Sequence, residues 1–295
     1  MSGDLIRRTS GGAVKRADPA LRRAVRRLMR EDPEAHRHLG WIPPLEWLGE
    51  QPFLIFEHHW QLKGVLACPP DQSGMCWLRL FAAAGGVGRR EVWSLLWSAA
   101  LQDLKDRGGV DAVHALVVES GLESLLRSTG FEQIAEVVVL DWEVGPGRVP
   151  PGIPEIDLRL LTLKDLDQVH QLDSRSFAPI WRNTRRQIRR AFQEAAFVVG
   201  AFQEGRLVGF QISTAGALAG HLARLAVDPE ARGRGIGKAL VADALDRFQR
   251  QGMVRVSVNT QRDNPASLEI YRQFGFVLQE GSFPVYAYPV RDEPR

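Results

Sequence analysis

Apolar residues recur along the chain with two different periods. In the second half, a spacing of three or four residues predicts a helix beginning at about Gly235, with apolar positions at Ile236, Leu240, Val241, Ala244, Leu245 and Phe248. Gly252 stands where such a helix ends. Runs rich in apolar and β-branched residues predict strands at 196–202, 206–214, 221–227, 254–260 and 283–290. With further helices expected from about Lys164 and from Pro265, the alternation predicts a mixed α/β fold.

The first half of the chain repeats this order of elements. The apolar stretch 77–84 leads into the small-residue loop 85–88, and a long helical pattern follows from Val92 to Leu104. A strand at 113–118 and a short helix come next. Both halves then reach a Gly-Phe pair, at Gly130-Phe131 and at Gly275-Phe276. Such self-similarity indicates an internal duplication.

One segment separates the two halves. Residues 144–154 read Val-Gly-Pro-Gly-Arg-Val-Pro-Pro-Gly-Ile-Pro. This density of proline and glycine excludes a helix interior and a central strand. We therefore expect two domains, residues 1–143 and 155–295, joined by a linker at 144–154.

Composition narrows the classes of partner. Lys and Arg total 38 against 35 Asp and Glu, a net charge of +3, which argues against nucleic acid or a charged membrane surface as partner. Cys68 and Cys76 form neither a disulfide framework nor a zinc ligand set, so no metal is expected. The N-terminus is charged where a signal peptide would be apolar, and no run is long enough to span a bilayer. A cytoplasmic protein is expected.

The segment 225–238, Leu-Ala-Val-Asp-Pro-Glu-Ala-Arg-Gly-Arg-Gly-Ile-Gly-Lys, carries the chemistry. A strand delivers a glycine-rich loop into the first turn of a helix. Glycines let a ligand approach the backbone closely, and the free amides of a helix N-terminus attract phosphate. The spacing is not that of a P-loop, because Ala239 follows Gly237-Lys238. It is not the dinucleotide fingerprint either, because the third glycine position is Lys238.

The pattern that fits is Arg/Gln-x-x-Gly-x-Gly/Ala, met by Arg232, Gly235 and Gly237. It resembles the pyrophosphate loop of the GCN5-related N-acetyltransferase (GNAT) superfamily. Residues 264–276, Asn-Pro-Ala-Ser-Leu-Glu-Ile-Tyr-Arg-Gln-Phe-Gly-Phe, resemble that family's Asn-x-x-Ala/Ser-x-x-x-Tyr-x-x-x-Gly-Phe element. The resemblance is strong over about 205–280 and extends more weakly to 155–290. It implies two tandem GNAT-type domains, each a mixed sheet flanked by helices.

The resemblance also implies acetyl-CoA as co-substrate and an amine acceptor. The residues expected to bind acetyl-CoA are Ala226, Val227, Arg232, Gly233, Arg234, Gly235, Ile236, Gly237, Lys238 and Asn264. In the family, the tyrosine matched by Tyr271 protonates the departing CoA thiolate. An amide near Ala226 or Val227 polarises the thioester carbonyl, and the amine attacks it directly without a covalent intermediate.

The base that accepts the proton of the amine is less defined. Related peptide N-terminal acetyltransferases often carry Glu where this chain has Asn259. His221 matches a histidine position of arylalkylamine acetyltransferases, and histidine titrates in the useful range. A water chain to solvent is the alternative.

A group of aromatic and basic residues falls where this fold builds its acceptor cap. Its members are Phe177, Trp181, Arg182, Arg185 and Arg186. They either hold an acidic or aromatic acceptor, or consist of a core tryptophan and a solvated basic face.

The first half resembles a degenerate GNAT domain. Ala83 or Ala84 takes the place of the Arg or Gln that leads the loop, and Leu126 takes the place of the tyrosine. The expected function is acetyl transfer from acetyl-CoA to a primary amine of a small molecule or peptide, with Asn259 mildly against a peptide N-terminus. The alternative is a non-catalytic acyl-CoA-binding regulatory protein. The sequence leaves open the acceptor, the base, CoA binding by the first half, the oligomeric state and the pathway.

Overall fold

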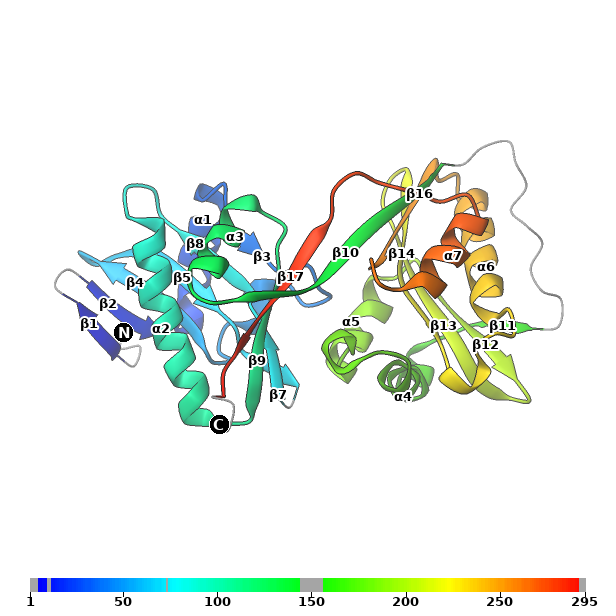
Figure 1. Ribbon diagram of the computed structural model, residues 1–295, viewed down its shortest axis with the longest axis horizontal. Helices are drawn as coiled ribbons and strands as arrows, with labels where there is room; N and C mark the ends of the chain where they lie inside the picture. Colours follow the sequence, from blue (N-terminus) through cyan, green and yellow to red (C-terminus); the bar gives the residue numbers. More distant parts are fainter. Residues whose placement is uncertain (1–4, 10–11, 73, 144–155, 292–295) are drawn as a thin grey trace. The chain divides into compact units, whose positions relative to one another are not determined.

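The computed structural model describes residues 5–9, 12–72, 74–143 and 156–291 (Figure 1). The chain forms two compact units, of which unit 1 comprises Met1–Ala135 with Phe283–Arg295 and unit 2 comprises Glu136–Ser282. Both are mixed α/β structures with helices packed on sheets, as the sequence predicts. The predicted linker at 144–154 lies outside the described residues.

The elements of unit 2 follow the predicted order closely. Its helices are α4 (Leu166–Ser176), α5 (Arg185–Glu194), α6 (Ile236–Arg250) and α7 (Pro265–Gln273). Its strands are β11 (Asp157–Leu160), β12 (Phe197–Gln203), β13 (Arg206–Ala215), β14 (Ala219–Val227), β15 (Arg255–Gln261) and β16 (Val277–Leu278), together with β10 (Glu132–Glu143) from Glu136 onward. Short 3-10 turns lie at Leu163–Asp165, Pro179–Trp181 and Pro229–Ala231.

The sheet of unit 2 has the order β11-β12-β13-β14-β15-β10. Helix α6 covers one face, because a Cβ on Gly209 of β13 would lie 2.8 Å from the Ile236 Cγ2 atom, and one on Gly220 of β14 would lie 2.5 Å from the Phe248 ring. All six predicted apolar positions of α6 are buried in this core. Helices α4 and α5 pack on β13, and Figure 1 shows them on the other side of the strands from α6 and α7.

Unit 1 repeats the architecture with more irregular strands. Its helices are α1 (Arg22–Glu31), α2 (Arg89–Arg107) and α3 (Ser120–Ser128). Its strands are β1 (Leu5–Thr9), β2 (Gly12–Arg16), β3 (His36–Arg37), β4 (Phe53–His58), β5 (Gln61–Ala67), β6 (Pro70–Gln72), β7 (Gly74–Trp77), β8 (Leu80–Ala83), β9 (Val110–Leu116) and β17 (Phe283–Pro289). Short 3-10 turns lie at Pro19–Leu21 and Pro44–Trp47.

The strands of unit 1 form two series. One has the order β1-β2-β4-β5-β8-β3, and the other runs β17-β9-β7-β6. The apolar stretch predicted at 77–84 is interrupted: β7 pairs in parallel with β9, whereas β8 pairs with β5. Helix α2 packs on β4, β5 and β8.

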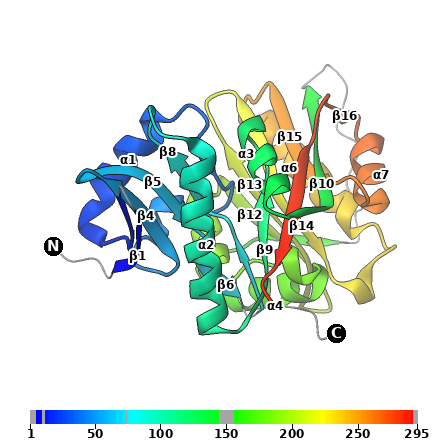
Figure 2. The ribbon, with the colours of Figure 1, turned by 60° about the vertical axis from the view of Figure 1, so that its left-hand side comes forward.

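The domain boundaries differ from those predicted. The last strand, β17, pairs antiparallel with β9 of unit 1, from Val285–Leu116 to Pro289–Ala112 (Figure 2). Tyr286 is fully buried in the core of unit 1. Conversely, β10 pairs with β15 of unit 2. Alternating apolar residues predict a strand but do not say which sheet it joins.

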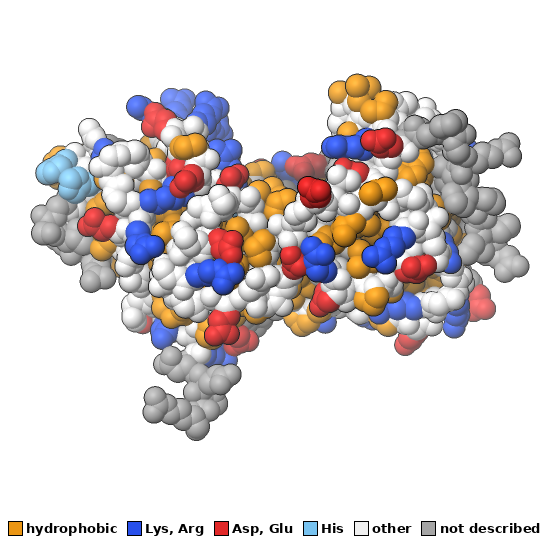
Figure 3. Space-filling view, turned by 45° about the horizontal axis from the view of Figure 1, so that its top comes forward, with side chains coloured by type: hydrophobic (Ala, Val, Ile, Leu, Met, Phe, Trp, Pro, Cys, Tyr) orange, Lys and Arg blue, Asp and Glu red, His pale blue; other side chains and the backbone are white. Residues whose placement is uncertain are grey.

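Charged side chains of both signs are interspersed over the face of the molecule in Figure 3. Among the helices that the structure describes, none combines the length and the apolar character needed to cross a lipid bilayer.

Candidate functional site

Two neighbouring strands of unit 2 diverge at the candidate site. The parallel pairing of β14 with β15 runs from Ala219–Arg255 to Leu222–Val258. Strand β14 then continues along β13 to Val227, and β15 continues along β10 to Gln261. A bulge in β14, where Ile212 pairs with Arg224 but Ser213 with Leu222, marks the point of divergence. Ala226 and Val227, the predicted thioester contacts, end the diverging part of β14.

The glycine loop turns from β14 into α6 through left-handed backbone conformations. Gly233 has φ 78° and Gly235 has φ 82°, angles that glycine adopts without steric cost. The first hydrogen bond of the helix runs from Ala239 N to the Gly235 carbonyl. The amides of Ile236, Gly237 and Lys238 therefore precede the internal bonding of α6, as an anion site at a helix N-terminus requires.

Close packing against α7 favours glycine at position 237, the last glycine of the loop. A Cβ on Gly237 would lie 3.1 Å from the Ile270 Cδ1 atom of α7. Asn264 immediately precedes helix α7, and its side-chain oxygen accepts a hydrogen bond from Ser267 N at 3.2 Å. Asn264 is thus a helix cap in the structure, and its predicted contact with the pantetheine arm stays a prediction.

Arg232 ties the loop to the opposite side of unit 2. Its guanidinium donates to the Ser176 carbonyl at 3.0 Å and to the Val227 carbonyl at 3.4 Å. The Ser176 hydroxyl also donates to Val227 O at 3.3 Å. Arg234 and Lys238 are exposed, so both cations are available to a phosphate ligand.

Tyr271 lies on α7 within the core of unit 2, with 3% of its surface exposed. Its ring contacts that of Phe276, with centroids 5.5 Å apart. Burial raises the pKa of its phenol, because the low dielectric disfavours the anion. Tyr271 therefore remains a protonated donor at neutral pH.

His221 lies at the last paired residues of β14 before the divergence. Its Nδ1 atom is 2.9 Å from the Ser257 hydroxyl. Burial lowers the pKa of His221, while hydrogen bonds to Ser257 and Asn259 and the charge of Asp141 oppose this shift. A largely neutral imidazole suits a base. Ser257 and Asp141 were not among the predicted site residues.

A buried ion pair fixes the segment between α4 and α5. Asp173, with no exposed surface, accepts two 2.8 Å hydrogen bonds from the Arg224 guanidinium of β14. Arg224 also donates to the Trp181 carbonyl at 2.7 Å and lies 3.5 Å from the centre of the Phe177 ring. The segment between α4 and α5 is thus held on β14 through the Phe177 ring and the Trp181 carbonyl, while Arg182 and Arg185 are exposed.

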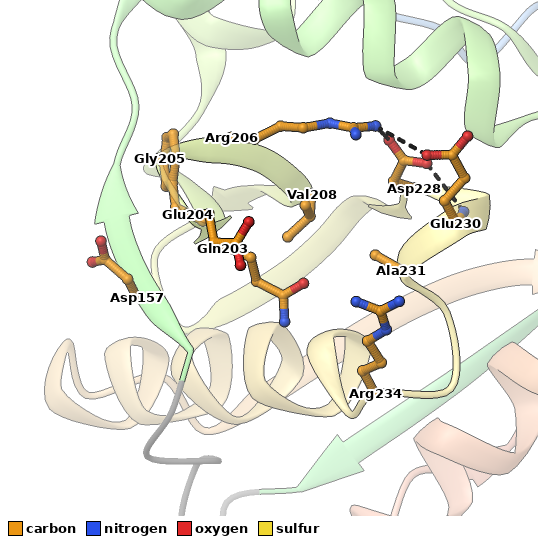
Figure 4. A pocket seen from close by; sticks show the side chains of 11 residues that line it. Asp157, Gln203, Glu204, Gly205, Arg206, Val208, Asp228, Glu230, Ala231 and Arg234 are labelled. Carbon is orange, nitrogen blue, oxygen red and sulfur yellow. Dashed lines mark hydrogen bonds and ion pairs between the residues drawn. The ribbon is translucent and has the colours of Figure 1, made fainter.

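A cavity of about 770 Å³ adjoins the glycine loop on the side of the β12–β13 turn. Arg234 from the loop and Arg206 from β13 line it, and Arg206 donates to the buried Asp228 at 2.9 Å (Figure 4). Tyr271 and His221 do not line this cavity. It therefore flanks the candidate site and does not coincide with it.

In each unit a strand glycine packs closely against a helix, and this shared packing shows which residues of α2 and α6 correspond. A Cβ on Gly64 of β5 would lie 2.3 Å from Val92 Cγ1 and 3.2 Å from Leu96 Cδ1, as one on Gly209 would meet Ile236 and Leu240. Val92 therefore corresponds to Ile236, and the next residue, Trp93, corresponds to Gly237.

This correspondence corrects the predicted alignment of the two loops. Helix α2 begins at Arg89, about one turn earlier than α6, so residues 85–87 precede the equivalent of the glycine loop and Gly88 stands at the position of Arg232. Trp93 is fully buried, stacked on Trp97 at 5.8 Å and against the edge of Phe81 at 5.0 Å. Unit 1 thus carries an indole where the loop of unit 2 has its last glycine.

The second motif aligns as predicted. Phe131 N donates to the Leu126 carbonyl at 3.1 Å, and Phe276 N donates to the Tyr271 carbonyl at 3.0 Å. Leu126 therefore occupies the position of Tyr271, and unit 1 has no hydroxyl there.

Comparison with known proteins agrees with this geometry. Residues 166–276 match the model of the acetyltransferase (GNAT) family. Mycothiol acetyltransferase of Clavibacter michiganensis subsp. michiganensis is 29% identical over 206 residues, which are 65% of this chain and 64% of that protein. The match thus spans just under two thirds of the length of that relative.

Two solved structures share the fold over nearly the whole chain. A GCN5-related N-acetyltransferase from Sphaerobacter thermophilus has a TM-score of 0.65 at 15% identity, covering 96% of this chain and 97% of that one. A tandem GNAT protein from the clavulanic acid biosynthesis pathway has a TM-score of 0.63 at 16% identity, covering 94% and 97%. The GNAT family match thus lies within unit 2, and the fold of the whole chain is similar to that of a tandem GNAT protein.

Proposed function

We propose that unit 2 is an acetyl-CoA-dependent N-acetyltransferase that passes the acetyl group directly to a primary amine of a small molecule or peptide. The observation that carries the proposal is the divergence of β14 and β15 beside the glycine loop of α6. Diverging strands leave backbone groups for an extended ligand arm, and the helix N-terminus offers amides to a pyrophosphate.

The residues predicted to act on the reacting atoms would take the following roles. An amide of the Ala226–Val227 segment polarises the thioester carbonyl, as a donor placed where negative charge develops. Tyr271 keeps its proton until the thiolate leaves. His221 accepts the proton of the amine, directly or through water.

The acceptor to test first is a mycothiol-related amine, because the Clavibacter michiganensis relative at 29% identity is a mycothiol acetyltransferase. A peptide amine is the second class to test. Peptide N-terminal acetyltransferases often carry a Glu at this position as the base, whereas this chain has the exposed Asn259 there, near His221.

The first test replaces Tyr271 with phenylalanine. We expect kcat to fall about a hundredfold, because general acid catalysis supplies a factor of that order, while the Kd for acetyl-CoA barely changes. Release of CoA from acetyl-CoA, measured with a panel of amines, gives kcat, and calorimetry gives Kd. Tyr288→Phe in unit 1 is the matched control and should retain full turnover.

Two outcomes would count against the proposal. Unchanged turnover in the Tyr271→Phe variant would refute the acid role of Tyr271. Tight binding of acetyl-CoA with no turnover for any amine would favour the alternative, a non-catalytic acyl-CoA-binding regulator.

A further inference from the structure

Three residues from three adjacent strands lie in one row beside the divergence. His221 of β14 pairs with Ser257 of β15, and Ser257 pairs with Asp141 of β10. Residues directly paired across strands project from the same face of a sheet. The three side chains therefore share a face, and the 2.9 Å contact between His221 Nδ1 and Ser257 Oγ joins the first two.

This row lies on the face that the acceptor would approach. Gly220 faces the Phe248 ring of α6, so the neighbouring His221 points to the opposite face. Arg224 reaches Asp173 of α4 on that opposite face. The row and the segment between α4 and α5, which Arg224 holds, thus lie on the same side of the sheet.

The two contacts of the Ser257 hydroxyl favour one tautomer of His221. Its oxygen also lies 3.5 Å from the Gly220 carbonyl, which can only accept a hydrogen bond. A serine hydroxyl has one proton, and donating it to Gly220 leaves its lone pairs for the Nδ1 proton of His221. The lone pair of the imidazole is then on Nε2.

Asp141 is the negative charge that acts on His221. Its side chain is only 15% exposed, and Arg255 Nη1 lies 3.5 Å away with 55% of its own side chain exposed. On the α4 side, Asp173 and Arg224 neutralise each other. Across on β13, His221 pairs with the uncharged Thr214.

We propose that Ser257 and Asp141 are positioning residues for His221: Ser257 fixes which ring nitrogen is free, and Asp141 supplies the charge that stabilises the protonated ring. Arg255 weakens that charge and thereby adjusts it. The catalytic meaning of the row rests on the proposed function, since His221 is the base only if unit 2 transfers acetyl groups.

The test measures His221 itself. Nitrogen-15 NMR of the full chain reports the tautomer and the titration of each imidazole, and a His221→Gln variant assigns the signal. In the wild type we expect the proton on Nδ1. Asp141→Asn should move the titration of His221 to lower pH, because a charge that favours imidazolium is lost. Arg255→Gln should move it to higher pH.

The pH dependence of kcat/KM tests whether Ser257 and Asp141 affect the reaction through His221. The acid limb of kcat/KM against pH should shift in the same directions as the NMR titration in the Asp141→Asn and Arg255→Gln variants. Ser257→Ala should lower kcat on the order of tenfold to a hundredfold, the range for a misplaced base, and Ser257→Thr should restore it. A merely structural serine or aspartate would leave the pH profile in place.

The outcomes separate the two proposals. A proton on Nε2 in the wild type, or a His221 titration that is the same in both charge variants, would overturn the proposal that Ser257 and Asp141 position His221. The predicted NMR shifts in a protein that acetylates no amine would support that proposal and refute the acetyltransferase function. NMR shifts without matching kinetic shifts, in an active enzyme, overturn the positioning role because His221 is then not the base.

Discussion

Single residues determine where the chain can meet a phosphate group. Gly235 has φ 82° at the start of α6, and Gly85 of unit 1 has a conformation open to any residue, with no atom within 4 Å of an added Cβ. Gly235→Ala should destabilise unit 2 by about 1 kcal/mol, the cost of a left-handed L-residue. It should also weaken acetyl-CoA binding about tenfold, which corresponds to a similar energy.

Denaturation by urea and calorimetry measure these two effects. Gly85→Ala is the matched control and should change neither. Gly235→Asn should recover part of the stability, because asparagine tolerates this conformation better than alanine. Equal effects of Gly235→Ala and Gly85→Ala would contradict the role given to the conformation of Gly235.

The motif residues could be predicted because they are close in sequence. Asn264 caps α7, and Tyr271 follows two turns later on the same face of the helix, as the spacing indicates. Ser257 could have been found, since it shares a strand face with Asn259 two residues away. Asp141 could not, because it precedes the proline-rich segment by only a few residues and belongs to the half of the sequence assigned to the other domain.

Among the elements, the segment between α4 and α5 depends on one buried ion pair. Asp173→Asn would leave the Arg224 guanidinium buried opposite a neutral amide, and removing one partner of such a pair costs about 3 kcal/mol. Because Arg224 also holds the Trp181 carbonyl and Phe177, the KM for the amine should rise more than the Kd for acetyl-CoA.

Asp167, also on α4, provides the comparison for this prediction. It pairs with Arg185 at 2.6 Å, but both side chains are at least half exposed. Exposed pairs contribute little to stability. Asp167→Asn should therefore leave the denaturation midpoint and both constants unchanged. If Asp173→Asn behaves like Asp167→Asn, the ion pair does not hold the segment between α4 and α5.

Elements with a strong period were predicted well, whereas the register between repeats was not. Helix α6 begins where glycine and the apolar period place its start. In unit 1, the glycines at 85–88 suggested the same loop, but α2 begins at Arg89 and its Trp93 takes the position of Gly237. Glycines mark permissive backbone, and only the packing of Gly64 against Val92 reveals the register.

At the scale of the whole molecule, each unit contains a segment from the other half of the sequence. The core of unit 1 includes Tyr286 near the C-terminus, and that of unit 2 includes Val138 and Leu140, before the predicted linker. Strand periodicity predicts these segments as strands but is silent on their partners. A boundary drawn at the proline-rich segment therefore misassigns both.

The two units should also differ in ligand binding. Unit 1 has the buried Trp93 at the position of the last loop glycine and Leu126 at that of the tyrosine, and its helix α2 begins about one turn earlier than α6. We expect only unit 2 to bind acetyl-CoA. The Gly237→Trp substitution, which gives unit 2 the residue that unit 1 has at this position, should abolish acetyl-CoA binding by unit 2.

The most direct measurement is a calorimetric titration of the full chain with acetyl-CoA. The account predicts saturation at one site per chain, lost in the Gly237→Trp variant and retained in Tyr271→Phe. Two sites per chain would contradict the inference that unit 1, which has Trp93 and Leu126 at the positions of Gly237 and Tyr271, does not bind acetyl-CoA. No binding at all would contradict the acetyltransferase assignment of unit 2.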